Sequence, residues 1–140
     1  LNCAFLWSQL ERMDQITDRR AAIFERYRRG LQPLEEQERL RLPYLPDDCA
    51  SNHHLFYILL PDTAGRDRLM HALHEDGILA VFHYVPLHSS PMGRALGTGS
   101  VALPVTDDVS GRVLRLPMFY ELTEPDQDFV IERVHHHLAS

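Results

Sequence analysis

The sequence has no lysine. Its fourteen basic residues, from Arg12 to Arg133, are all arginines. A Schiff base forms on a primary amine, which the guanidinium group of arginine cannot supply at neutral pH. Schiff-base chemistry on a lysine side chain is therefore excluded for these 140 residues.

Several other features are absent or scarce. No apolar run approaches the roughly 20 residues that cross a bilayer, so we expect no membrane partner. The net charge of −6 argues against nucleic acid as a partner. The two cysteines, Cys3 and Cys49, are too few for a disulfide framework. We expect them to be free thiols in a reducing cytoplasm.

The common catalytic and metal-binding motifs are also missing. Neither Cys-x-x-Cys nor His-Glu-x-x-His occurs, although the chain has nine histidines. Zinc needs three or four converging ligands, whereas His71, His74 and residues 135–137 are typical of helix positions, so we predict no metal site. The Gly-x-Ser-x-Gly, P-loop and Gly-x-Gly-x-x-Gly motifs are absent as well. The sequence therefore identifies no catalytic residue.

The start of the chain has a strong helical pattern. Apolar residues recur at three- and four-residue steps and predict one helix of about 28 residues, ended by Gly30 and Pro33. Residue 1 is leucine rather than methionine, and it lies inside this pattern with no N-cap before it. Because the first turn of a helix needs capping, we expect the chain to be the later part of a longer protein.

The remaining residues predict a small sheet covered by helices, which is an α+β fold. Apolar runs that stop at proline or follow turn residues predict strands at 54–60, 78–85 and 113–116. Short helices are expected after Asp62 or Thr63, over 91–96, from Thr106 and from Thr123, with a flexible loop at 97–100. The buried face of the last helix is expected to contain Phe129, Val130, Ile131, Val134 and Leu138.

One segment places several polar side chains at the end of a predicted strand. In Phe82-His83-Tyr84-Val85-Pro86-Leu87-His88, an apolar run leads directly into two histidines and a tyrosine. Titratable groups that leave the end of a core strand are well placed to line a cleft. A strand end whose polar tips reach solvent would give the same pattern.

This segment and three others resemble the C-terminal part of the DegT/StrS-type sugar-nucleotide aminotransferases. The segment from His83 to His88 resembles the family's Tyr-x-Pro-Leu-His element and is the most specific match. Residues 1–11 resemble its Leu-x-Ala-Ala helix, residues 52–57 the strand entry of its small domain, and residues 115–123 its closing Leu-Pro element with a capped last helix.

The resemblance implies the small C-terminal domain of a fold-type I, pyridoxal-phosphate-dependent transferase. Residues 1–31 would form the helix between domains and between the subunits of a homodimer, and residues 32–140 the small αβ domain. The parent enzyme would transfer an amino group from glutamate to a dTDP-4-keto-6-deoxyhexose. Its cofactor lysine would lie upstream of Leu1, so this chain alone would be inactive and would bind no cofactor.

The resemblance also implies candidate substrate-binding residues. His83, Tyr84 and His88 would line the substrate side of the cleft, because tyrosine and histidine can hydrogen-bond sugar hydroxyls or phosphate oxygens. Arg94 is a weaker candidate for an anionic ligand.

The sequence is also compatible with two other kinds of protein. The chain could be a free-standing small-molecule-binding or regulatory module, whose first helix should begin with a start codon and a cap. It could also be a metal-binding protein built on its histidines.

Overall fold

The sheet has three short antiparallel strands. A computed structural model of the protein describes residues 2–97 and 101–139, so most of the loop predicted at 97–100 lies outside the described residues. The strand order is β1-β3-β2, and the strands are β1 (Phe56–Leu59), β2 (Val81–Phe82) and β3 (Val113–Leu116). The predicted third strand and the α+β class are confirmed.

The first two strands are shorter than predicted, and the short central strand limits the length of the first. In β3, Leu114 pairs with Ile58 and Phe82, and Arg115 pairs with Tyr57 and Val81. The chain is helical immediately before Val113, and Pro117 lacks an N–H immediately after Leu116. The four residues of β3 therefore pair with four residues of β1, whereas β2 pairs with β3 only at Val81 and Phe82.

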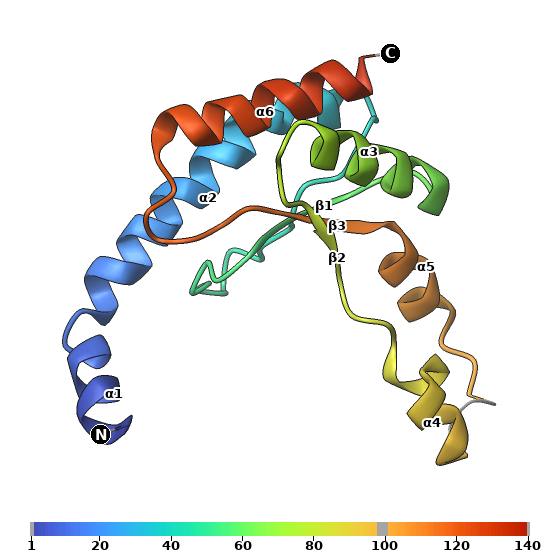
Figure 1. Cartoon of the computed structure of the whole chain (residues 1–140), viewed down its shortest axis with the longest axis horizontal. Coiled ribbons are helices and arrows are strands. Elements are labelled where there is room, and N and C mark those ends of the chain that lie inside the picture. Colours follow the sequence, from blue (N-terminus) through green and yellow to red (C-terminus); the bar gives the residue numbers. More distant parts are fainter. Residues whose placement is uncertain (1, 98–100, 140) are drawn as a thin grey trace.

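Helices cover one face of this sheet (Figure 1). Alternate strand residues point to that face, and Phe56, Ile58, Leu114 and Leu116 are buried there. The covering helices are α2 (Met13–Glu36), α3 (Thr63–Glu75) and α6 (Glu124–Leu138). In the same view, α1 (Asn2–Leu10), α4 (Pro91–Ala95) and α5 (Pro104–Arg112) extend away from the sheet on the side opposite α6.

The predicted first helix is in fact two helices, and its predicted end is wrong. The helical pattern is interrupted by a turn at Glu11 and Arg12, and α2 continues through Gly30 and Pro33 to Glu36. Gly30 is a packing residue, because a Cβ at this position would lie 2.7 Å from Cδ1 of Ile131 on α6. Its carbonyl also lies 2.8 Å from Nε2 of His135.

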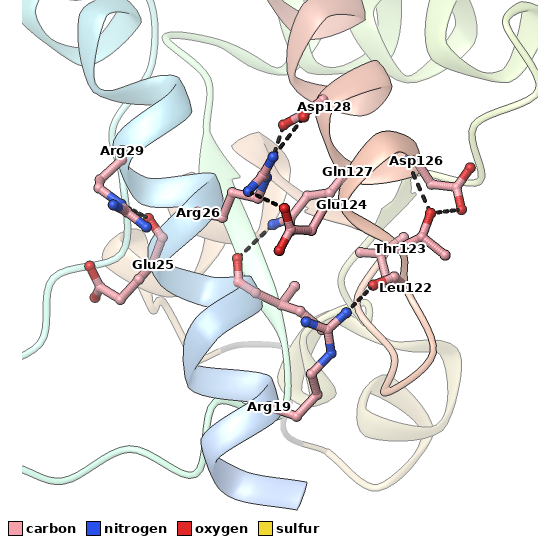
Figure 2. A network of polar contacts seen from close by, with 11 residues as sticks. Arg19, Glu25, Arg26, Arg29, Leu122, Thr123, Glu124, Asp126, Gln127 and Asp128 are labelled. Atoms are coloured by element: carbon pink, nitrogen blue, oxygen red, sulfur yellow. Dashed lines mark hydrogen bonds and ion pairs between the residues drawn. The ribbon is translucent and has the colours of Figure 1, made fainter.

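An ion-pair network fixes the crossing of α2 and α6 (Figure 2). The guanidinium of Arg26 donates to Asp128 at 2.7 and 2.9 Å and to Glu124 at 3.0 Å. Nearer the start of α2, Nη2 of Arg19 donates to the carbonyl of Leu122 at 2.5 Å. These contacts join segments about a hundred residues apart, since Arg26 and Asp128 are 102 positions apart in sequence.

Two buried polar side chains complete this packing. Gln127, only 1% exposed, donates from Nε2 to the carbonyl of Ile23 at 2.6 Å. The hydroxyl of Tyr27 donates to the carbonyl of Pro117 at 2.9 Å, and burial raises the pKa of this phenol. The prediction for α6 is wrong at Phe129, which is 46% exposed, because the buried stripe follows Gln127, Val130 and Val134 instead.

The predicted helix caps are largely confirmed. Asp62 caps α3 by accepting a hydrogen bond from the N–H of Gly65 at 2.7 Å, and Thr123 caps α6 through the N–H of Asp126. The helix predicted from Thr106 begins earlier, at Pro104, a residue suited to a first helical position. The segment predicted at 91–96 forms α4, and a 3-10 turn, η1 (Leu87–Ser89), precedes it.

The described residues contain neither a membrane-spanning helix nor a metal-binding cluster. No helix there has the length and apolar character to cross a membrane. No group of three or more metal-binding side chains comes together in that part of the chain. Both cysteines are free and exposed.

Candidate functional site

The face of the sheet opposite the covering helices carries a cleft of about 610 Å³. Tyr57 and Arg115 form its floor, because they are neighbours in the strand register and both lie between residues that point into the core. Apolar residues of α5 and of the segment after β2 form much of the wall. The residues that line the cleft and carry polar side-chain groups are Tyr57, His83, Tyr84, Thr106, Ser110 and Arg115.

The chain brings His83 and Tyr84 to this cleft by ending β2 early. Because β2 stops at Phe82, the next residues leave the edge of the sheet and turn toward α5. The rings of His83 and Tyr84 meet edge to face, with centroids 5.2 Å apart. Tyr84 is exposed, and His83 is half-buried beside it. Two of the three predicted binding residues therefore line one cleft.

His88 lies elsewhere. It belongs to η1, where its Nε2 is 3.0 Å from Oδ1 of Asp107 and its side chain is only 10% exposed. It lines an adjoining apolar hollow of about 670 Å³ with Met92 and Leu96. The two hollows share Leu87 and Thr106. The structure therefore separates His88 from His83 and Tyr84, and contact of all three with one ligand stays a prediction.

Arg115 is a feature of the cleft to which the sequence analysis assigned no role. Its guanidinium carbon lies 5.9 Å from the centroid of the Tyr84 ring, within the range of a cation–π contact. Its Nε is buried and has no hydrogen-bond partner in the part of the chain that the structure describes. A signal was present in the sequence, since a charged residue between Leu114 and Leu116 in a short strand must point away from the core. Arg94, the weaker candidate, is exposed on α4 and lines neither hollow.

The chemistry of the cleft suits binding rather than catalysis. Its lining is largely apolar with a few polar groups, as in sites that hold small organic molecules. None of the lining residues is an aspartate, glutamate, cysteine or lysine. Imidazole, phenol and guanidinium groups can orient hydroxyls and oxyanions of a ligand. The cleft therefore has groups that can hold a polar organic molecule.

Comparison with known sequences gives one family for nearly the whole chain. The profile of the DegT/DnrJ/EryC1/StrS aminotransferase family matches residues 1–135. The chain is also 34% identical, over 128 residues, to a dTDP-3-amino-3,4,6-trideoxy-alpha-D-glucose transaminase of Micromonospora megalomicea subsp. nigra. That match covers 90% of this chain and 33% of the relative.

Two solved structures share the fold of nearly the whole chain. DesV of S. venezuelae superposes with a TM-score of 0.87 at 30% identity, over 98% of this chain and 36% of DesV. NtdA of Bacillus subtilis, solved with the cofactor PMP bound, superposes with a TM-score of 0.79 at 27% identity, over 90% of this chain and 29% of NtdA. The chain thus spans about a third of the length of each of these relatives.

Proposed function

Since the chain belongs to the DegT/DnrJ/EryC1/StrS aminotransferase family, we propose that it is the C-terminal small domain of a sugar-nucleotide aminotransferase. The observation that carries the proposal is the family match over residues 1–135 by a chain that spans about a third of its relatives. The cleft on the open face of the sheet supports it, because that face carries imidazole, phenol and guanidinium groups that can bind a polar ligand.

The role of this domain would be to bind and orient the sugar nucleotide. His83 and Tyr84 project into the cleft from the edge of the sheet, where they can hydrogen-bond sugar hydroxyls. His88 would act from the adjoining hollow, in which Asp107 orients its ring. In the reaction, glutamate would give its amino group to the ketone of the sugar.

The cofactor would be held by residues outside this chain. Pyridoxal phosphate, of which PMP is the amino form, supplies the electron sink for amino transfer when bound. The sequence has no lysine to attach it, so the residues present do not fit covalent binding of the cofactor. We therefore propose that the 140 residues alone are inactive and that the cofactor lysine lies upstream of Leu1.

The substrate we propose is dTDP-4-keto-6-deoxyglucose, with dTDP-4-amino-4,6-dideoxygalactose as the product. A 3-keto sugar nucleotide is the alternative, because the relative from Micromonospora megalomicea is named for a 3-amino product. We further propose a homodimer in which residues 1–31 take part. A cytoplasmic location is in keeping with two exposed, unbonded thiols.

The test is an amino-transfer assay on two proteins. One is the product of the complete reading frame that contains residues 1–140, and the other is the 140-residue chain alone. Each is incubated with pyridoxal phosphate, glutamate and either the 4-keto or the 3-keto sugar nucleotide, and 2-oxoglutarate and amino sugar are measured. The protein from the complete reading frame should aminate the 4-keto sugar nucleotide. The 140-residue chain alone should form neither 2-oxoglutarate nor amino sugar.

Other results would replace the proposal. Amination of the 3-keto sugar alone would move the reaction to C3. A reading frame that starts next to Leu1, with no amino transfer, would instead favour a free-standing binding or regulatory module.

A further inference from the structure

We propose that Arg115 is an oxyanion-binding residue in the cleft and that it holds a carboxylate or phosphate group of a substrate. The identity of that substrate rests on the proposed function, whereas the presence of an anion site does not. The sequence resemblance gave no role to Arg115, and the inference comes from its position in the cleft and from its buried Nε, which has no hydrogen-bond partner among the described residues.

The sheet fixes where the guanidinium lies. Arg115 is on the central strand and pairs with Tyr57 on one side and Val81 on the other. Leu114 and Leu116, its chain neighbours, are both in the core, so the strand cannot shift register without exposing them. The Arg115 side chain is thereby held on the floor of the cleft.

The positive charge of Arg115 has no carboxylate partner among the described residues. Its Nε is buried without a hydrogen-bond partner, and no aspartate or glutamate lines the cleft. Within residues 2–97 and 101–139 it takes part in no ion pair. Removing part of the hydration of a guanidinium without supplying an anion is unfavourable, so a ligand oxyanion in the cleft would satisfy it.

Two other arginines show what a structural role looks like in this fold. Arg26 makes ion pairs with Glu124 and Asp128 across the helix crossing. Arg112 pairs with Asp108 and donates to the carbonyl of Leu60 at 3.2 Å. Each of them donates to acceptor oxygens of another part of the chain, although Nε of Arg112 also has no hydrogen-bond partner. Within the described residues, the guanidinium of Arg115 makes no such bond or ion pair and lies over the Tyr84 ring.

The contact with Tyr84 leaves the guanidinium available for a ligand. A cation–π contact supplies no acceptor oxygen, so it leaves the N–H groups of the guanidinium without the hydrogen bonds that an oxyanion could accept. Those N–H groups form a fork that matches two oxygens of a carboxylate or a phosphate. Under the proposed function, the carboxylate would come from glutamate and the phosphate from the diphosphate of the sugar nucleotide.

The experiment titrates the 140-residue chain with two probes, inorganic pyrophosphate and L-glutamate, at constant ionic strength. Binding is followed through the arginine Nε–H signals by NMR, and the variants Arg115→Gln and Arg115→Lys are compared with Arg68→Gln. Arg68 is an exposed arginine on α3, outside the cleft, so its replacement makes the same charge change. Thermal unfolding of each variant verifies that it is folded.

We expect one of the probes to bind the wild-type chain and Arg115→Gln to weaken it about tenfold or more, as for loss of a charged hydrogen bond. Arg68→Gln should have no effect, and Arg115→Lys should retain part of the affinity, because it keeps the charge but loses the fork. The probe with the higher affinity identifies the phosphate or the carboxylate as the partner.

Several results would overturn the inference. They are the absence of binding by either probe, an equal loss with Arg115→Gln and Arg68→Gln, or binding that Arg115→Lys and Arg115→Gln leave unchanged. The proposed function fails independently, since it is measured as amino transfer. Anion binding through Arg115 without amino transfer would leave the site standing and the function wrong.

Discussion

At the scale of single residues, Asp76 joins the end of α3 to α6. Its Oδ2 accepts a hydrogen bond of 2.7 Å from Nε of Arg133 and lies 2.6 Å from Nε2 of His137. The hydrogen bond from Arg133, and after it that from His137, hold the pKa of the Asp76 carboxyl below its usual value. A group with a lowered folded-state pKa stabilises the fold above its unfolded pKa and loses this effect as the pH falls through the folded value.

We therefore expect Asp76→Asn to lower the free energy of unfolding at pH 7. The difference from wild type should shrink as the pH falls through the carboxyl range and vanish below the folded pKa of Asp76, where the wild-type group is protonated as well. Urea denaturation at a series of pH values measures this. Asp47→Asn, at an exposed position in the connector, is the control. If the free energy of unfolding of Asp76→Asn stays below that of wild type by the same amount down to acid pH, the account is contradicted.

The sequence predicted some residues of the site for sound physical reasons and missed others. The strand end made His83 and Tyr84 possible cleft residues, and the family resemblance assigned them there; the structure places both in one cleft. The position of His88 depends on η1, a short turn that has no clear apolar pattern. Arg115 could have been found from strand alternation, but its missing partner becomes visible only when the chain is folded.

At the scale of secondary structure, the crossing of α2 and α6 depends on Gly30. The backbone of Gly30 is helical, and the space for a side chain at this position is taken by Ile131. Two effects of a Gly30→Ala substitution oppose each other. Alanine favours a helix over glycine by about 1 kcal/mol, whereas overpacking a filled contact costs about 1–3 kcal/mol.

We expect the clash to be the larger effect, so Gly30→Ala should reduce stability. In the background of Ile131→Ala, which removes the clashing atoms, the same substitution should instead raise stability by up to about 1 kcal/mol. A double-mutant cycle of Gly30→Ala and Ile131→Ala, measured by urea unfolding, gives the coupling between the two sites. Stabilisation by Gly30→Ala in both backgrounds would show that the close contact does not exist.

Short sequence patterns predicted which helices and strands form better than they predicted where each one ends. The caps at Asp62 and Thr123 were correct because capping needs only residues within one turn. Gly30 and Pro33 were read as the end of a helix, but packing against α6 overrides their low helix propensity. The length of β2 could not be predicted, because its apolar run continues on both sides of the two residues that pair with β3.

At the scale of the whole molecule, α1 presents large apolar side chains to solvent. Phe5, Leu6, Trp7 and Leu10 are all more than half exposed, and α1 contributes no buried residue to the core. In Figure 1, α1 lies beyond the start of α2, at the end of the molecule away from the sheet and from α6. Apolar area of this kind on one helix is typical of an interaction surface.

We predict that the 140-residue chain associates with itself through α1. The average mass in sedimentation equilibrium should rise with concentration, and the emission of Trp7, the only tryptophan, should shift to the blue. The double variant Leu6→Glu and Leu10→Glu should remain monomeric, whereas Leu79→Glu, at another exposed leucine, should behave as wild type. A wild-type chain that is monomeric at every concentration would contradict this prediction.

The central claim for the whole molecule is that this domain binds the sugar part of the reaction and leaves the cofactor to the rest of the enzyme. The most direct measurement uses the complete enzyme with His83→Ala and Tyr84→Ala, and with His71→Ala, at an exposed helix position, as control. We predict that KM for the sugar nucleotide rises about tenfold in the two cleft variants, as for loss of one hydrogen bond. The absorbance of bound pyridoxal phosphate should not change. Loss of the cofactor with an unchanged KM for the sugar nucleotide would contradict the account.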